Sequence, residues 1–524
     1  MLDMTRRNML QRASAGLAAG ALGVPSGLMA QTPQPKKGGN ASVAMSAATE
    51  TVDPHFSRSQ VARNVLMHMC ETLVTIDERG SPQLQLAEKL DISPDSRVFT
   101  FALRKGVPFH NGKEMTADDA KRSLERYARV SPERSRLANV DRMTTPDRHT
   151  LIVELKSSTP SWIELIKSPA SPMTIIPSEE CDKEANKVLP ISTGPYSFVD
   201  WDGVTRLRGK RFADYAPNKA YAGRDGYGGA RTAYFDEIAF AVVAEASARV
   251  AGLQSGQFDI LDELPVQAAD RLGKDSQFKI YDQKTRGINV VPVNVQKSPT
   301  DKILVRRAIQ IALDDEEIMG IATEGAFSLN PSFVYKDSEF YPANASDLVY
   351  NRKDQARAKA LLAEAGYKDE ELVILTSGDI PSLREVAVVM SEQLKAVGMK
   401  VRLDVMDWPG ANARRNDPTT HNLFSTAYAI QPLLGPFQYQ RLVSGAGNWS
   451  FYKEDEDMET AWRRLLAATS AADQKKAWQD IETRLNSQVY QLKMGDRSVK
   501  QAAKASIQNF KPYDGVRLWD IWKA

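Results

Sequence analysis

The stretch AEKLDISPDSRVFTFALRKGVPFHNGKEMTADDAKRSLERYAR, residues 87–129, predicts one strand, one tight turn and one helix. Phe99, Phe101 and Leu103 alternate with less apolar residues, the period of two that is typical of a half-buried strand. Asn111-Gly112 then predicts a turn, because both residue types tolerate a positive φ. Local and long-range patterns agree here, so this part of the chain is well specified.

A helix is predicted directly after the turn. Thr116 suits the N-cap position, and Asp119 stands three residues later, where its carboxylate can accept from the N-cap amide as in a capping box. The acidic pairs Asp118-Asp119 and Glu179-Glu180 are therefore interpreted as capping or solvated groups, without catalysis. The core-facing stripe of the predicted helix consists of Ala117, Ala120, Leu124 and Tyr127.

The length and charge of the chain limit its class. Its 524 residues exceed what one hydrophobic core normally supports, so two or three domains are expected. Lys and Arg total 68 against 66 Asp and Glu, and this balance argues against a nucleic-acid-binding protein. The two cysteines are Cys70 and Cys181. Buried thiols without a disulfide are favoured at so wide a separation, although pairing stays open if the protein is exported.

The N-terminus predicts an export signal. Thr5-Arg6-Arg7-Asn8-Met9-Leu10 carries the paired arginines of a twin-arginine signal, and an apolar run rich in Ala and Gly follows at 13–29. Cleavage is expected near Ala30, before a linker at 31–37. A short membrane anchor that is never cut is the alternative interpretation. The mature protein is expected outside the cytoplasm, in the periplasm.

The rest of the chain alternates strands and helices, which predicts an α/β fold in several domains. One βαβ unit is expected at 372–405, and its two strands should pair in parallel. Strands are predicted at 41–45, 151–155, 174–176, 196–201, 205–210, 237–243, 372–375 and 401–405. Helices are predicted at 59–71, 161–166, 246–255, 305–313, 358–365, 386–397, 457–469 and 472–488.

A search for catalytic and cofactor motifs gives little. The sequence contains no Gly-x-Ser-x-Gly elbow, no phosphate-binding P-loop and no His-Glu-x-x-His zinc helix. The histidines are scattered without metal-ligand spacing, at positions 55, 68, 110, 149 and 421. For His110, beside the Asn-Gly turn, a hydrogen bond that stabilises the turn is expected. A hydrolase assembled from distant residues stays open.

The quoted stretch resembles the signature region of the solute-binding proteins of family 5, the peptide/nickel-type receptors of ABC importers. Further segments similar to the family follow in order along nearly the whole mature chain. These segments are Met69-Cys70-Glu71-Thr72-Leu73-Val74, Ser192-Thr193-Gly194-Pro195-Tyr196, residues 252–260, Val305-Arg306-Arg307-Ala308-Ile309 and residues 358–367.

The resemblance implies an α/β fold of the two-lobed periplasmic binding protein type II (cluster C), with three domains of which the first is discontinuous. On this chain, domain I takes 38–67, 190–280 and 496–524, the inserted domain II takes 68–189, and domain III, the opposing lobe, takes 281–495. It also implies that closure of the lobes around a ligand presents a monomeric receptor to an ABC permease at the inner membrane. No catalysis, cofactor, metal or nucleic acid is expected. The quoted stretch then has a structural role.

The resemblance also suggests ligand-binding residues. Val405-Met406-Asp407-Trp408 is similar to the position at which peptide-binding members carry a tryptophan, so Trp408 is a candidate contact or, alternatively, a core-packed side chain. Further along, peptide receptors of the family carry an acidic residue that pairs with the peptide α-ammonium group. The matching segment, residues 428–436, has no carboxylate. The candidates are Trp408, Tyr428, Gln431, Ser377, Asp379, His55 and Phe56.

The missing carboxylate bears on the ligand. A buried ammonium without a counter-charge is costly, so recognition of a free peptide N-terminus is not expected unless Asp379 or another residue substitutes. The apolar, Pro-rich segment suits a less charged ligand.

Two functional classes follow. The first is a periplasmic receptor that captures a peptide-like or other small organic solute for an ABC importer. The second is an exported enzyme, or a chaperone-like or sensor protein, that uses the same two-lobe scaffold, since a fold alone does not fix function. Ligand-dependent stabilisation without turnover favours the first, and turnover abolished by one polar substitution favours the second.

Overall fold

The computed structural model describes residues 34–57, 60–169, 171–336, 338–378, 380–428, 432–439 and 455–524, with only the backbone at 60, 284–286, 409 and 432–434. The chain divides into two units, Met1–Gln34 and Pro35–Ala524. The predicted export signal and cleavage site lie in the first unit, outside the described residues. Within the described part of the second unit, no helix combines the length and apolar character needed to cross a membrane.

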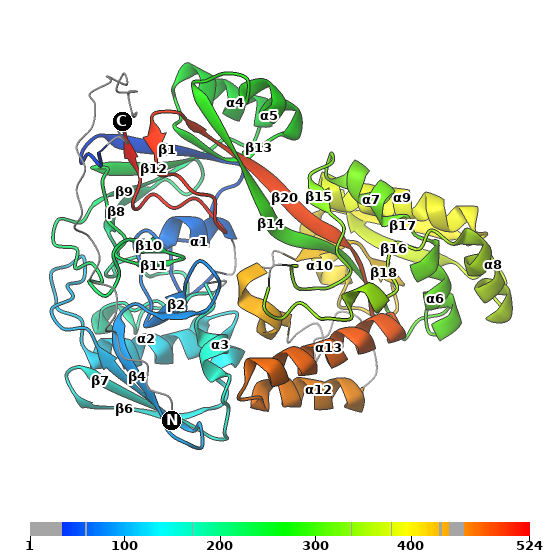
Figure 1. Cartoon of the computed structure of the whole chain (residues 1–524), viewed down its shortest axis with the longest axis horizontal. Helices are drawn as coiled ribbons and strands as arrows, with labels where there is room; N and C mark the ends of the chain where they lie inside the picture. The colour runs from blue at the N-terminus through cyan, green and yellow to red at the C-terminus, as the bar shows by residue number, and fades with distance from the viewer. Residues whose placement is uncertain are drawn as a thin grey trace, which may run out of the picture. The chain divides into compact units, whose positions relative to one another are not determined.

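A nine-stranded sheet has the strand order β19-β14-β20-β13-β1-β12-β9-β8, and β15 pairs with β20 beside this path (Figure 1). β1 lies parallel to both of its neighbours, β12 and β13. The predicted strands at 41–45, 196–201, 205–210 and 237–243 are confirmed. The bounds are β1 (Asn40–Met45), β8 (Tyr196–Trp201), β9 (Arg206–Arg211), β12 (Glu237–Val242), β13 (Ile260–Leu264), β14 (Phe278–Pro292), β15 (Phe327–Ser328), β19 (Thr426–Tyr428) and β20 (Gln491–Lys504).

Helices α1 (Gln60–Leu66), α4 (Ala246–Ser255) and α5 (Val266–Leu272) accompany this sheet. α4 ends as predicted at Gly256, whose φ of 88° suits a residue without a side chain. The prediction of a helix to residue 71 was wrong, because α1 ends at Leu66. The buried Arg231 guanidinium donates to the carbonyls of Met67 and Cys70, so these groups are satisfied without further helical turns.

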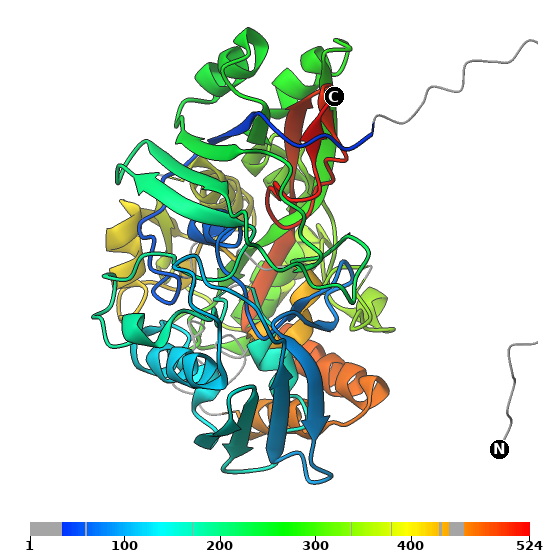
Figure 2. The ribbon, with the colours of Figure 1, turned by 90° about the vertical axis from the view of Figure 1, so that its left-hand side faces the viewer.

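A second sheet is antiparallel and has the order β4-β5-β7-β6, and its strands β4 and β5 come from residues 87–129. Phe99, Phe101 and Leu103 on β5 are buried as predicted, and they share one core with the apolar stripe of helix α2. Helix α2 lies beside this sheet (Figures 1 and 2). The predicted strand at 174–176 was wrong, since Thr174 forms only an isolated bridge to Thr72. The bounds are β4 (Ala87–Ile92), β5 (Val98–Leu103), β6 (Val140–Asp147), β7 (Thr150–Leu155), α2 (Ala117–Val130) and α3 (Trp162–Ile166).

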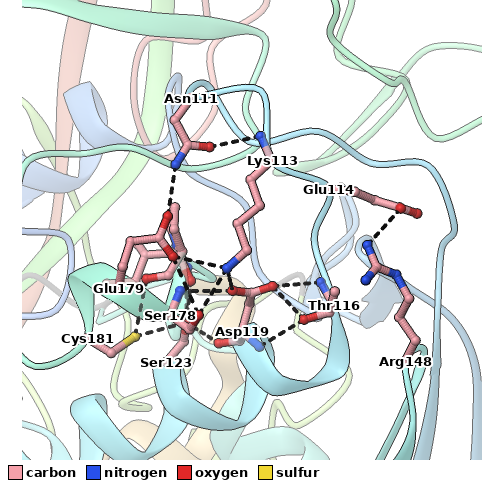
Figure 3. Close-up of polar contacts among 12 residues, drawn as sticks. Asn111, Lys113, Glu114, Thr116, Asp119, Ser123, Arg148, Ser178, Glu179 and Cys181 are labelled. Atoms are coloured by element: carbon pink, nitrogen blue, oxygen red, sulfur yellow. Dashed lines mark hydrogen bonds and ion pairs between the residues drawn. The ribbon is translucent and has the colours of Figure 1, made fainter.

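The start of α2 carries the predicted capping box. The Thr116 amide donates to Asp119 Oδ2 over 2.9 Å, and the Asp119 amide donates back to the Thr116 hydroxyl over 3.4 Å. The other carboxylate oxygen, Oδ1, accepts from Lys113 Nζ at 2.7 Å and from the Ser178 amide at 2.8 Å (Figure 3). Lys113 also reaches Glu179 Oε2 over 3.0 Å. Asp119 therefore fastens the helix start to two neighbouring loops.

The Asn-Gly turn is confirmed, and Gly112 has a φ of 84°. The expected role of His110 was wrong, because its ring bonds a different segment. Nε2 donates to the Gly194 carbonyl over 3.0 Å, and Nδ1 accepts from the Ser192 amide over 3.3 Å. Gly194 itself lies so close to the backbone of Met69 that an added Cβ would stand 2.5 Å from its carbonyl carbon. This close approach explains the glycine in the Thr-Gly-Pro-Tyr turn.

The second half of the chain holds a three-stranded parallel sheet in the order β17-β16-β18. The predicted βαβ unit is confirmed in β16 (Leu372–Ser377), α9 (Pro381–Ala396) and β17 (Val401–Met406). Together with α6, α7 and α8, this unit encloses one apolar core. The remaining bounds are β18 (Leu423–Phe424), α6 (Ile303–Ala312), α7 (Asp315–Ala322), α8 (Gln355–Glu364), α10 (Trp408–Arg414), α12 (Glu456–Ala467) and α13 (Ala471–Gln488).

The long antiparallel pair β14–β20 links the two halves (Figure 1). At one end Phe278 and Ile280 pack into the core beneath α4 and α5. At the other end Ile288 and Val290 pack into the core formed with α12 and α13. The same two strands therefore belong to both halves. Smaller strands are β2 (Val74–Ile76), β3 (Pro82–Leu84), β10 (Arg224–Asp225), β11 (Gly228–Gly229), β21 (Ile507–Gln508) and β22 (Trp522–Lys523), and short 3-10 helices are η1 (Arg134–Leu137), η2 (Ser178–Glu180), η3 (Ala345–Asp347) and η4 (Pro432–Tyr439).

Candidate functional site

The carboxyl ends of β16, β17 and β18 meet at one edge of the parallel sheet, which we call the carboxyl edge. The chain runs from β16 through α9 to β17 on one side, and then through α10 to β18 on the other side of β16. Ligands of open α/β sheets bind outside the carboxyl ends of strands where the connections change side in this way. The carboxyl edge is therefore the first candidate for a binding surface.

Three predicted site residues lie at or shortly after the carboxyl ends of these strands. Ser377 is the last residue of β16, Trp408 comes two residues after β17, and Tyr428 ends β19, shortly after β18. Ser377 and Tyr428 are buried, whereas Trp408 is partly buried. Asp379 and Gln431 lie outside the described residues.

Trp408 begins α10, where the Asp407 carboxylate accepts the Gly410 amide over 2.9 Å as the N-cap. Its ring stacks on Phe424, with centroids 6.4 Å apart and planes inclined by 16°. Trp408 also packs against the buried Leu375 and Ala411. The Trp408 side chain is therefore packed on one side and accessible on the other, which fits both a ligand contact and a core-packed ring.

Phe424 and Arg415 belong to the same cluster, although the sequence analysis did not single them out. The Arg415 guanidinium carbon lies 5.8 Å from the centroid of Phe424. Arg415 stands seven residues after Trp408, a spacing of two helical turns that places both residues on one helix face. This seven-residue spacing is the sequence signal from which Arg415 could have been identified.

Tyr428 connects the carboxyl edge to the long strand pair. Its hydroxyl donates to Gln491 Oε1 on β20 over 3.2 Å. Burial raises the pKa of Tyr428 far above its usual value, and the positive charge of Arg415 offsets part of that rise. The phenol is therefore a neutral hydrogen-bonding group at physiological pH.

On the first half, the loop after β1 carries His55 and Phe56. Asp53 binds the buried Arg126 of α2 in bidentate fashion, with Oδ1–Nη1 and Oδ2–Nη2 distances of 2.9 and 2.6 Å. His55 Nε2 donates to the Thr174 carbonyl over 2.8 Å, and Nδ1 accepts from Arg126 over 3.2 Å. Burial, aided by the Arg126 charge, lowers the pKa of His55 to about 4.

Both ring nitrogens of His55 are therefore engaged inside the protein, and the ring is neutral. Its neighbour Phe56 is 37% exposed. The loop thus presents an aromatic surface through Phe56, while His55 holds the loop in place. Among the described residues, no group of three or more His, Cys, Asp or Glu side chains is arranged to hold a metal ion.

The fold is that of the type II periplasmic binding proteins, a class of extracytoplasmic receptors. The family model for bacterial extracellular solute-binding proteins, family 5 Middle, matches residues 81–450, well over half of the chain. The chain therefore belongs to the family 5 bacterial extracellular solute-binding proteins.

Relatives in this family carry different ligand names. "Probable peptide ABC transporter periplasmic-binding protein y4tO" of Sinorhizobium fredii is 24% identical over the full length of both chains. The glutathione-binding protein GsiB of Escherichia coli is 25% identical over 74% of this chain and 73% of its own. Among solved structures, the binding protein AgaA of A. tumefaciens R10 in complex with agropinic acid has a TM-score of 0.77 and 22% identity, covering 93% of this chain and 99% of its own. The last likeness supports the fold alone.

Proposed function

We propose that the protein is a periplasmic receptor that captures a small peptide-like or other organic solute and delivers it to the permease of an ABC importer. The observation that carries this proposal is the family match over residues 81–450, which spans both halves of the fold and the carboxyl edge. The relatives include proteins named as peptide- and glutathione-binding, and this supports the class of ligand.

In this proposal the two halves act as lobes and the β14–β20 pair acts as their hinge. Domain I takes 38–67, 190–280 and 496–524, domain II takes 68–189, and domain III takes 281–495. The separate sheets β4-β5-β7-β6 and β17-β16-β18 support the last two divisions. Closure brings Phe56 of the first lobe and Trp408 of the second onto opposite faces of the ligand. Ser377, Tyr428, Asp379 and Gln431 complete the second-lobe surface.

The ligand chemistry follows from the charges at the carboxyl edge. Residues 428–436 contain no carboxylate, while Arg415 lies over Phe424 and near Tyr428. Such a surface does not supply a counter-charge for a peptide α-ammonium group. We therefore propose a solute bound through its apolar and uncharged polar groups, or through an anionic group, unless Asp379 provides the negative charge.

The export route belongs to the same proposal. The paired arginines Arg6 and Arg7 support export through the twin-arginine route, with cleavage near Ala30. In this proposal the mature receptor acts as a monomer. The receptor performs no catalysis and needs no cofactor. Its protein partner is an inner-membrane permease.

The test begins with mature protein, residues 31–524, purified under native conditions. Mass spectrometry of the small molecules released on denaturation should identify one predominant solute. That solute, added back to stripped protein, should raise the Tm. Trp408→Ala should weaken binding about tenfold or more, because it removes a large stacking surface.

Two outcomes would contradict the proposal. One is the absence of any co-purifying solute together with no Tm shift across peptides, glutathione, opines, sugars and small acids. The other is turnover of the bound solute that a single polar substitution abolishes, which would identify an exported enzyme. Trp462→Phe, a conservative change at a tryptophan buried in the core between α12 and α13, serves as the control for general effects of tryptophan replacement.

A further inference from the structure

The turn at Asn111-Gly112 carries the groups needed for spontaneous deamidation. It is the one place in the sequence where glycine follows asparagine. Because glycine has no side chain, its backbone nitrogen can come close to the carboxamide carbon of the asparagine before it. Both residues are exposed, so water reaches the turn. The pair is therefore the asparagine in this chain that is most open to attack by its own backbone.

The residues just before the pair are held firmly by the rest of the protein. The His110 amide donates to the Ser192 carbonyl over 2.8 Å, and the His110 ring bonds Gly194 and Ser192. Phe109 is buried, and its amide donates to the Lys113 carbonyl over 2.8 Å. The turn therefore cannot move as a whole without breaking buried contacts, and local movement is confined to its exposed tip.

Three hydrogen bonds engage the reacting groups of the tip. The Gly112 amide donates to the Phe109 carbonyl over 2.8 Å, so the nitrogen that would attack is occupied. Asn111 Oδ1 accepts from the Lys113 amide, and Asn111 Nδ2 donates to Glu179 Oε1, each over 3.1 Å (Figure 3). The carboxamide is thus held at both ends. Attack of the glycine nitrogen on the carboxamide requires this arrangement to open.

Glu179 supplies the outermost of these contacts. Its side chain is 51% exposed, and its second carboxylate oxygen accepts from Lys113 Nζ over 3.0 Å. Lys113 Nζ also donates to Asp119 Oδ1 over 2.7 Å, which fixes the lysine beside the start of α2. Exposed hydrogen bonds open locally at a small free-energy cost, without unfolding of the surrounding structure. The bond between Glu179 and Asn111 is therefore the contact whose opening exposes the carboxamide.

We propose that Asn111 is a latent deamidation site, which Glu179 holds inactive and which reacts when the tip of the turn opens. The Gly112 nitrogen then attacks Asn111 Cγ, and the new C–N bond closes a cyclic succinimide. The bond from Cγ to Nδ2 breaks, and Nδ2 leaves as ammonia with the proton that the Gly112 nitrogen loses. Water opens the ring at either carbonyl, which leaves aspartate or isoaspartate at position 111.

Both products change the charges around the turn. A carboxylate in place of the carboxamide loses the donor to Glu179 and puts a second negative charge beside it. Isoaspartate also carries the chain through its side-chain carbon, so the backbone of the turn becomes longer. Because Glu179 and Asp119 share Lys113, either product alters the electrostatic surroundings of the start of α2.

The experiment incubates the mature protein, residues 31–524, at mildly alkaline pH and maps its peptides by mass spectrometry at intervals. Glu179→Ala removes the acceptor of Asn111 Nδ2. Glu180→Ala, the matched control, removes the neighbouring carboxylate, which pairs with Lys183. The wild-type chain unfolded in urea gives the rate in the absence of all these contacts. Chromatography of the peptide that contains position 111 separates the aspartate from the isoaspartate product.

The folded wild type should deamidate at Asn111 at least about tenfold more slowly than the unfolded chain. Glu179→Ala should raise the rate about threefold or more, whereas Glu180→Ala should leave it unchanged. Both aspartate and isoaspartate should form, because the succinimide opens on either side. Equal rates in the folded and unfolded chain, an unchanged rate in Glu179→Ala, or an equal rise in Glu180→Ala overturns the proposal. Aspartate as the sole product also overturns it, because direct hydrolysis would then replace cyclisation.

Discussion

The surroundings of α2 and the carboxyl edge of the β17-β16-β18 sheet are both strand–helix units. They differ in how far their side chains are buried and hydrogen-bonded within the protein. Around α2, Asp119 is buried with four donors, and Arg126 is buried against Asp53. At the carboxyl edge, α10 has only 7 residues, Trp408 is partly open, and Val405 is 50% exposed.

This difference indicates that the surroundings of α2 contribute to stability and the carboxyl edge to solute recognition. Buried polar groups that make all their hydrogen bonds hold the backbone in one arrangement. Losing these bonds lowers the unfolding free energy. Partly open aromatic rings add little to the fold but remain able to contact a solute. Substitutions around α2 should therefore change stability, and substitutions at the carboxyl edge should change binding.

The largest expected effect comes from Asp53→Ala. It leaves the buried Arg126 guanidinium without its bidentate partner, and removing one member of a buried ion pair costs about 3–5 kcal/mol of unfolding free energy. Urea unfolding followed by fluorescence measures this loss. Asp200→Ala, which breaks the partly exposed ion pair with Arg208, is the control and should cost far less than Asp53→Ala. Equal losses of unfolding free energy in the two variants would contradict the view that the buried ion pair stabilises the fold more than the partly exposed one.

Asp119→Asn should cost about 1–3 kcal/mol, because it weakens the capping box and the Lys113 contact together. Burial alone would raise the pKa of Asp119, but hydrogen bonds from Lys113, Thr116 and the Ser178 amide outweigh it and hold the pKa below its usual value. The stabilisation is therefore present above about pH 4 and is lost as the pH falls through the lower folded-state pKa.

Unfolding free energies measured from pH 6 to pH 2 test this dependence. The gap between wild type and Asp119→Asn should close toward the acidic end. Asp118→Asn is the matched control, since Asp118 is exposed on the same helical turn. A gap that stays constant with pH would show that the carboxylate charge has no part in the effect.

Arg415→Gln should lower the unfolding free energy by about 1–2 kcal/mol, because the guanidinium is partly buried over the buried ring of Phe424. Its effect on binding depends on ligand charge. Affinity for an anionic solute should fall, whereas affinity for a neutral amide-bearing solute should stay within about twofold. Calorimetry with one solute of each kind makes the comparison. A large Tm loss would instead assign Arg415 to the fold.

Phe56→Ala should have the smallest effect on stability, about 1 kcal/mol, because the ring is only partly buried, at 37% exposed. Affinity for the co-purified solute should nevertheless fall several-fold, since an apolar face of the first lobe is lost. Ile92→Ala, at another exposed apolar residue, provides the control and should leave affinity unchanged.

Much of the fold could be predicted because its signals are local. The alternation at Phe99–Leu103, the Thr116–Asp119 capping box and the glycine that ends α4 each depend on neighbouring residues. The errors came from long-range contacts. The helix stops at Leu66 because Arg231, far along the chain, satisfies the carbonyls of Met67 and Cys70 that follow α1, and His110 bonds Gly194 instead of its own turn.

The candidate site was less predictable for the same reason. Trp408 could be singled out by its resemblance to a family position. Phe424 and Arg415 can be recognised only from their contacts in the structure, because the Phe424 ring contacts both Trp408 and Arg415. The assignments of Asp379 and Gln431 stay predictions.

The two cysteines are buried and unlinked, and they offer reporters of two separate cores in the first half of the fold. Cys70 belongs to the core of the nine-stranded sheet, and Cys181 to a small cluster beside α2 with Ile176 and Val188. Burial raises the pKa of the Cys70 thiol to about 12 and that of Cys181 to about 11, so neither reacts readily in the native state. Alkylation rates at the two positions would therefore record how often each core opens, and a solute that ties the lobes together should slow alkylation of both.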